Sequence, residues 1–263
     1  MKLTIIGAGN MGGAIAVGVA KSGIIAAENI TITAKTKETL AKISAIEPKI
    51  KTLQDNAAAV KGADLIILAI KPWLFEEVIN QIKGELDYNC QSIASVAAGL
   101  DFNFLTNLLD NGSGVEPTIY RVVPNTAISL GKSVTYISAC RASKKELEQL
   151  TTIFNTLGES FVIDESMVGA GTSLASCGIA FALKYIDAAA KGGVGLGFSE
   201  QEALHMVIGT MEGALELLKT NNSLPQAEID KVTTKGGITI KGIEAMNVAG
   251  FDNAVNEGLV KSR

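Results

Sequence analysis

The stretch Leu3-Thr-Ile-Ile-Gly7-Ala-Gly9-Asn-Met-Gly12 decides the fold. Its first four residues are apolar or β-branched, which predicts a short buried strand. The glycines match the pattern G-x-G-x-x-G, and the small and apolar residues from Asn10 to Ser22 predict a helix that ends at Gly23. A strand, a glycine-rich turn and a helix in this order are typical of a dinucleotide-binding site.

Each glycine of this motif has a physical role. Gly7 permits the tight turn, Gly9 lets a pyrophosphate approach the backbone, and Gly12 lets the helix lie close to the strand. The phosphates would bind free N–H groups at the positive end of the helix dipole. The predicted cofactor-binding residues therefore include the whole loop: Gly7, Ala8, Gly9, Asn10, Met11 and Gly12.

The next strand is predicted over Asn29–Thr33, where apolar and polar residues alternate. In a dinucleotide fold that binds NAD, an Asp or Glu after this strand holds the ribose 2′-hydroxyl. Here the sequence reads Ala34-Lys-Thr-Lys37 instead. Lys35, Lys37 and the hydroxyl of Thr36 suit a 2′-phosphate, and we predict that Lys35 and Thr36 bind the cofactor. This favours NADPH, with NADH as the alternative.

Two further apolar runs, over residues 64–70 and 92–99, predict strands buried on both faces, as in a parallel sheet. Ligands of open α/β sheets bind beyond the carboxyl ends of the strands. We therefore predict that the residues ending these runs line the cofactor: Ala69, Ile70, Lys71 and Pro72 in the first, and Ala97, Ala98 and Gly99 in the second.

Strand signals continue over residues 118–123, 133–138 and 159–164 and then largely vanish, whereas helical signals dominate from Glu165 onward. We therefore predict an α/β protein with a Rossmann-type doubly wound sheet over residues 1–164. An all-helical C-terminal domain follows over residues 165–263. Its helices are strongly apolar for so small a body, which predicts burial between subunits.

Composition excludes several classes of partner. The net charge is −4 and no block of basic residues stands out among the 263, which argues against nucleic acid. The three cysteines are far apart and there is one histidine, so we expect no disulfide framework and no metal site. This pattern fits the reducing cytoplasm.

Residues 166–183 carry no charge and reach the length at which a membrane span is considered. The segment also contains hydroxyl-bearing and glycine residues and few large aliphatic ones. We therefore predict a helix packed against other protein, and no membrane partner.

Five stretches together resemble one family, pyrroline-5-carboxylate reductase, the last enzyme of proline synthesis. In chain order the matching stretches are Gly7-Ala-Gly-Asn-Met-Gly12, Ala69-Ile-Lys-Pro72, Val96-Ala-Ala-Gly99, Arg121-Val-Val-Pro-Asn-Thr126 and Val232-Thr-Thr-Lys-Gly-Gly-Ile-Thr239. The last two are far more specific than the glycine loop.

The resemblance implies hydride transfer from NADPH to the C=N carbon of 1-pyrroline-5-carboxylate, which gives L-proline. The residues suit this small-molecule substrate, because Gly236-Gly237 before a helix offers N–H donors to its carboxylate. By resemblance, Thr239 is the catalytic residue, whose hydroxyl would hydrogen-bond the ring nitrogen. The resemblance also implies that Thr234 and Glu165 bind substrate and that Asn56 contacts the cofactor ribose. It further implies a homodimer through the helical domain, with further assembly left open.

Three positions depart from the family pattern. The stretch Ala175-Ser-Cys-Gly-Ile-Ala180 lacks the usual proline, Thr234-Lys235 replaces Ser-Pro before the glycine pair, and Ala127 replaces a proline. Two other functions therefore stay open. One is a related NADP-dependent imine or hydroxyacid reductase, although Lys184 is poorly placed for a hydroxyacid dehydrogenase. The other is an NADP-binding protein without catalysis.

Overall fold

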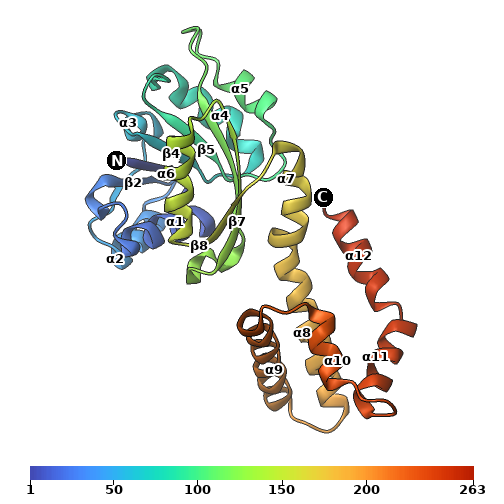
Figure 1. The fold of residues 1–263 in the computed structure, drawn as a ribbon. Helices are drawn as coiled ribbons and strands as arrows, with labels where there is room; N and C mark the ends of the chain where they lie inside the picture. The colour runs from blue at the N-terminus through green and yellow to red at the C-terminus, as the bar shows by residue number, and fades with distance from the viewer. The chain divides into compact units, whose positions relative to one another are not determined.

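The computed structural model describes all residues from Met1 to Arg263. The chain divides into two compact units, Met1–Ser176 with Arg263, and Cys177–Ser262. In Figure 1 the first unit begins in blue and the second ends in red. This division falls within the long segment that begins at Glu165. The predicted domain boundary at residue 164 lies at the start of the same segment. The division into a cofactor domain and a substrate domain at that residue stays a prediction.

One sheet of eight strands lies at the centre of the first unit, in the order β3-β2-β1-β4-β5-β6-β7-β8. Strands β1 to β6 run parallel, β7 is antiparallel to β6, and β8 is parallel to β7. The order of the first six is that of dinucleotide-binding folds. The strands are β1 Leu3–Ile6, β2 Ile30–Thr33, β3 Lys51–Leu53, β4 Leu65–Leu68, β5 Ser92–Ser95, β6 Thr118–Val123, β7 Ser133–Cys140 and β8 Gly158–Val162.

Helices cover both faces of this sheet because successive strand residues point to opposite sides. Ile5 belongs to a buried cluster with side chains of α1, α2 and α6, whereas Ile6 belongs to a second cluster with side chains of α3, α4 and α5. These two clusters confirm the predicted doubly wound sheet. The helices are α1 Asn10–Ser22, α2 Lys37–Ile46, α3 Asn56–Val60, α4 Phe75–Ile82, α5 Phe102–Leu109 and α6 Lys144–Asn155.

Local signals in the sequence account for most of these boundaries. Helix α1 ends at Gly23, which adopts φ 73°, as predicted. Ser143 caps α6 with a reciprocal bond to Glu146. Several strand ends differ from the prediction. Strand β4 ends at Leu68 rather than at residue 70, and β5 ends at Ser95 rather than at residue 99. Strand β7 extends to Cys140, and β8 ends at Val162 rather than at residue 164. The three-residue strand β3 was not predicted, because two of its residues are exposed and it has no sequence signal.

The end of the first unit contains a π-helical turn. Helix α7, Val168–Gly171, continues into this turn over Thr172–Cys177. The turn overlaps the first three residues of the stretch 175–180, which departs from the family pattern. The Nδ2 atom of Asn125, in the loop after β6, donates to the Ala175 carbonyl oxygen at 3.4 Å. A Cβ atom at Gly171 would lie 2.8 Å from the ring of Tyr136 on β7. The small residues therefore let this segment pack against the sheet.

The second unit is entirely helical, as predicted. Helix α9 begins at a capping box, in which Ser199 and Glu202 bond reciprocally. A Cβ atom at Gly193 would lie 2.9 Å from the Cβ of Ala203, so a small residue lets α8 and α9 approach closely. The helices are α8 Gly178–Gly195, α9 Glu200–Asn221, α10 Pro225–Val232, α11 Ile238–Val248 and α12 Phe251–Lys261.

The uncharged segment over residues 166–183 lies within a helix that runs from Glu165 to Gly195, a length of 31 residues. By length and composition alone it could cross a membrane, but only 17% of its most apolar window is buried within the chain. The predicted packing against other protein is therefore not supplied by this chain itself.

Candidate functional site

The glycine loop between β1 and α1 is closely packed at two of its glycines. Gly7 adopts φ 105°, which L side chains rarely do. A Cβ atom at Gly12 would lie 1.9 Å from the Gly7 carbonyl oxygen and 2.8 Å from the Cβ of Ala69. Helix α1 therefore rests directly on the turn and on the residue after β4, which leaves room only for glycine at position 12.

The start of α1 is open to an anion. Gly9 precedes the helix without any side-chain cap, and a Cβ atom there would meet nothing within 4 Å. The Gly13 N–H donates to the Gly9 carbonyl oxygen at 2.8 Å. The N–H groups of the residues before Gly13 are among the donors that a helix start leaves unpaired. These donors, at the positive end of the helix dipole, suit a phosphate.

The end of β2 lies beside this loop, because the Gly7 N–H donates to the Thr33 carbonyl oxygen at 3.1 Å. The side chain of Lys35 is exposed, and its carbonyl oxygen accepts a bond from Gln54 Nε2 at 2.8 Å. Thr36 caps α2 by accepting from the Thr39 N–H at 3.3 Å. The hydroxyl of Thr36 therefore already has one structural role at the helix start.

A cavity of about 200 Å³ lies where these elements meet. Hydrogen bonds join three of its side chains. Asn56 accepts from Thr33 Oγ1 at 2.7 Å and donates from Nδ2 to Gln81 Oε1 at 2.9 Å. Four predicted cofactor residues, Gly7, Lys35, Asn56 and Ile70, thus line one space. The full lining is Ile6, Gly7, Thr33, Ala34, Lys35, Gln54, Asn56, Ile70, Leu74, Glu77, Val78 and Gln81.

Four polar residues of this cavity were not predicted from sequence as site residues: Thr33, Gln54, Glu77 and Gln81. Glu77 and Gln81 lie one helical turn apart on α4, and Gln81 Nε2 donates to Glu77 Oε1 at 3.5 Å. Such a pair normally indicates only a solvated helix face. The signal could have been the position of α4 directly after β4, because this helix begins at the ligand-binding edge of the sheet.

The other predicted cofactor residues lie in the connections after β4 and β5. Lys71 and Pro72 are exposed at a short 3₁₀ turn, and the Lys71 carbonyl oxygen accepts from the Leu74 N–H at 2.9 Å. Ala97 is buried, whereas Ala98 and Gly99 are exposed, and Gly99 adopts φ 86°. Both connections follow the carboxyl ends of parallel strands, as the rule for ligand sites in such sheets requires.

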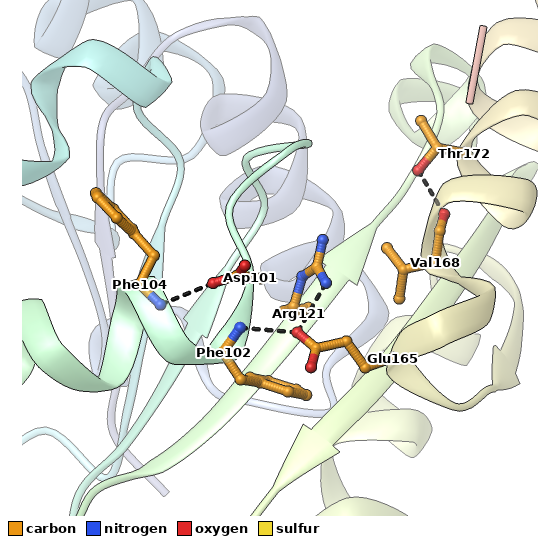
Figure 2. A network of polar contacts seen from close by, with 7 residues as sticks. All are labelled: Asp101, Phe102, Phe104, Arg121, Glu165, Val168 and Thr172. Atoms are coloured by element: carbon orange, nitrogen blue, oxygen red, sulfur yellow. Dashed lines mark hydrogen bonds and ion pairs between the residues drawn. The ribbon is translucent and has the colours of Figure 1, made fainter.

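Glu165 lies in a network of polar contacts at the end of the first unit (Figure 2). Its Oε1 atom accepts from the Phe102 N–H at 2.7 Å and from Arg121 Nη1 at 2.9 Å. The side chain of Arg121 is 10% exposed and that of Glu165 is 38% exposed. The predicted substrate-side acid is thus engaged by two donors of its own unit.

In the second unit the other predicted substrate residues come together in a single turn before α11. Gly236 adopts φ 76°, and the Gly237 N–H donates to the Thr234 carbonyl oxygen at 2.9 Å. A Cβ atom at Gly237 would lie 2.8 Å from Thr234 Oγ1, so the turn is closely packed at Gly237, and the positive φ favours glycine at position 236. Thr239 is exposed in the first turn of α11, beside the unpaired N–H groups of the helix start.

Two family models match different parts of the chain. A family model described as pyrroline-5-carboxylate reductase dimerisation matches residues 165–263. A second, described as NADP oxidoreductase, coenzyme F420-dependent, matches residues 2–99.

Relatives match over nearly the whole chain. A pyrroline-5-carboxylate reductase of Aquifex aeolicus is 33% identical over 98% of this chain and 93% of its own length. Pyrroline-5-carboxylate reductase 1 of Dictyostelium discoideum is also 33% identical, over 99% of this chain, which spans 48% of that longer relative.

Solved structures share the fold. The 1-pyrroline-5-carboxylate reductase of Streptococcus pyogenes superposes with a TM-score of 0.85 at 26% identity, covering 100% of this chain and 98% of that one. A pyrroline carboxylate reductase of Plasmodium falciparum with NADP bound has the same fold, with a TM-score of 0.88 at 24% identity and coverage of 100% and 95%.

The strand order and the glycine loop at the start of α1 define a dinucleotide-binding fold, and the matched family model and relatives make the chain an NAD(P)-dependent oxidoreductase. Its helical second unit corresponds to a dimerisation module, so the chain forms homo-oligomers. The chain belongs to the pyrroline-5-carboxylate reductase family.

Proposed function

We infer that the chain catalyses the NADPH-dependent reduction of 1-pyrroline-5-carboxylate to L-proline. The observation that supports this most directly is the similarity to the pyrroline-5-carboxylate reductase of Aquifex aeolicus, which is 33% identical over 98% of this chain. When bound, the cofactor supplies a hydride to the imine carbon, and the protein supplies placement and electrostatics. Holding the two reactants in the right orientation contributes roughly 7–11 kcal/mol to such a reaction.

The first unit binds the cofactor. The backbone from Gly7 to Gly12 receives the pyrophosphate at the start of α1, and Asn56 contacts the ribose from within the cavity. The Lys35 ammonium and the Thr36 hydroxyl receive the 2′-phosphate. The connections after β4 and β5 line the nicotinamide half with Ala69, Ile70, Lys71, Pro72, Ala97, Ala98 and Gly99.

The turn before α11 binds the substrate. The N–H groups that follow Gly237 are unpaired donors at a helix start, so they attract the carboxylate of the imine acid. The Thr239 hydroxyl stands in the same turn and hydrogen-bonds the ring nitrogen, which orients the C=N bond for attack. Thr234 belongs to the same turn, because its carbonyl oxygen accepts from the Gly237 N–H, and we assign it to the substrate site as well.

The helical region, residues 165–263, serves as the substrate and dimerisation domain of a cytoplasmic homodimer. Large apolar side chains are exposed on its helices, including Ile238 at 88% and Val248 at 91%. A single chain leaves these surfaces in contact with water, and a second copy covers them. The same contact covers the uncharged part of the long helix, residues 166–183, so we expect this helix to pack against protein and not to enter a membrane.

The decisive experiment measures NADPH oxidation by absorbance with 1-pyrroline-5-carboxylate, with L-proline quantified as the product. We expect turnover with NADPH and weaker turnover with NADH. 3-Hydroxyisobutyrate with NADP⁺ serves as the control for a hydroxyacid dehydrogenase and is expected to give none. Cofactor binding without proline formation would instead identify a non-catalytic NADP-binding protein.

Lys35→Glu is expected to weaken NADPH binding by about 10- to 100-fold, because it replaces a charge-assisted bond to the 2′-phosphate with repulsion. NADH lacks that phosphate, so its dissociation constant should change little. Both constants can be measured by fluorescence titration. The matched control is Lys51→Glu at the exposed amino end of β3, which makes the same charge change away from the cavity. Equal loss for both cofactors would refute the assignment of the 2′-phosphate.

A further inference from the structure

A hydrogen bond holds each end of the connection between β5 and α5. The Ala97 N–H donates to Ser95 Oγ at 3.3 Å, and Asp101 Oδ1 accepts from the Phe104 N–H at 2.7 Å. Between them Gly99 adopts φ 86° and is exposed. The position of this short connection therefore depends on how firmly the start of α5 is held.

A second carboxylate holds the start of α5 from far along the chain. The Phe102 N–H, at the first position of α5, donates to Glu165 Oε1 at 2.7 Å across a separation of 63 residues. Figure 2 shows Glu165 reaching toward both Phe102 and Arg121. Asp101 and Glu165 thus divide the N–H groups of one helix start between them. A carboxylate at this place is also favoured by the helix dipole.

The buried charge of Arg121 requires a carboxylate at the position of Glu165. Arg121 lies on β6 in register with Ser95, the last residue of β5, and its side chain is only 10% exposed. Its Nη1 atom donates to Glu165 at 2.9 Å, its guanidinium lies 6.0 Å from the centre of the Phe102 ring, and its Nε atom is buried without a partner. A guanidinium buried in this way needs a counter-charge, and Glu165 supplies it.

We propose that Glu165 and Arg121 are positioning residues, whose ion pair fixes the start of α5 and thereby the Ala97–Gly99 connection against the nicotinamide half of the cofactor. Glu165 acts through the Phe102 N–H and does not touch the substrate. The proposal rests on the proposed function, which assigns that connection to the nicotinamide. It differs from the role that family resemblance implies for Glu165.

The test compares Glu165→Gln, Arg121→Met and the double variant in the full-length enzyme. Asp164→Asn is the matched control, since it removes the neighbouring exposed charge. Either single variant is expected to lower kcat by about 10- to 100-fold through misplacement of the hydride donor, with the KM for 1-pyrroline-5-carboxylate unchanged. The double variant should be no worse than either single one, because both remove the same interaction.

Hydrogen–deuterium exchange provides a readout that does not require activity. Peptides covering residues 96–105 should exchange faster in both single variants and not in the control. Unchanged exchange, additive losses in kcat, or a raised KM confined to Glu165→Gln would each overturn the proposal. If the unmodified enzyme shows no turnover, the proposed function fails, and the exchange data still decide whether the ion pair holds α5.

Discussion

Gly12→Ala is expected to destabilise the first unit by about 1–3 kcal/mol and to abolish NADPH binding in the micromolar range. The added Cβ atom would lie 1.9 Å from the Gly7 carbonyl oxygen. Because that atom belongs to the backbone, α1 must move away from β1 to relieve the clash. Alanine gains about 1 kcal/mol over glycine in a helix interior, but this gain cannot restore the anion site at the displaced helix start.

Gly13→Ala provides the control for this variant, because it makes the same substitution one position further along α1. There the nearest atom is the terminal Cδ1 of Ile43 at 3.1 Å, which can shift by rotation of its side chain. We expect stability and NADPH affinity close to those of the unmodified protein. Thermal unfolding and fluorescence titration measure both variants. A Gly12→Ala protein with unmodified stability and affinity would contradict the close packing of α1 on the loop.

Thr239→Ala is expected to lower kcat by about 100-fold while leaving the dissociation constant of NADPH unchanged. The reason is that, in the proposed function, the hydroxyl hydrogen-bonds the ring nitrogen of the substrate and belongs to a turn remote in sequence from the glycine loop. The side chain is exposed in the first turn of α11, and alanine is a good helix former, so the fold should be kept.

Two further variants sharpen this prediction. Thr239→Ser retains the hydroxyl and should restore most of the activity, whereas Thr239→Val retains the shape without the hydroxyl and should not. Steady-state kinetics with both substrates and an NADPH titration give the required constants. Equal losses in turnover and in NADPH affinity would show that Thr239 supports the fold and does not orient the substrate.

Local chemistry explains why much of the fold could be predicted from the sequence. The first strand and helix, the stop at Gly23, and the capping boxes at Ser143 and Ser199 all depend on residues within one or two turns of each other. The run from Leu65 to Leu68 is apolar throughout because it is buried on both faces of the sheet. Such signals need no knowledge of distant contacts.

The cavity beside β2 shows where local reasoning stops. Gln54 and Gln81 have ordinary polar surroundings in the sequence, and they become site residues only because β3 and α4 bring them beside Asn56. Strand β3 itself exists through pairing with β2, since its three residues carry no pattern of their own. Pairing between strands is a property of the assembled sheet.

The sequence by itself determines the strand, glycine loop and helix of the dinucleotide site, and it also determines the Gly236-Gly237 turn. The reason is that backbone conformation and the chemistry of helix ends depend on neighbouring residues. The partner of Glu165 had to come from the folded chain. Arg121 is 44 residues away, and burial on β6 is what makes its charge demand a carboxylate. The hydrophobic effect brings such residues together across long separations, and their electrostatics take effect only after the sheet has formed.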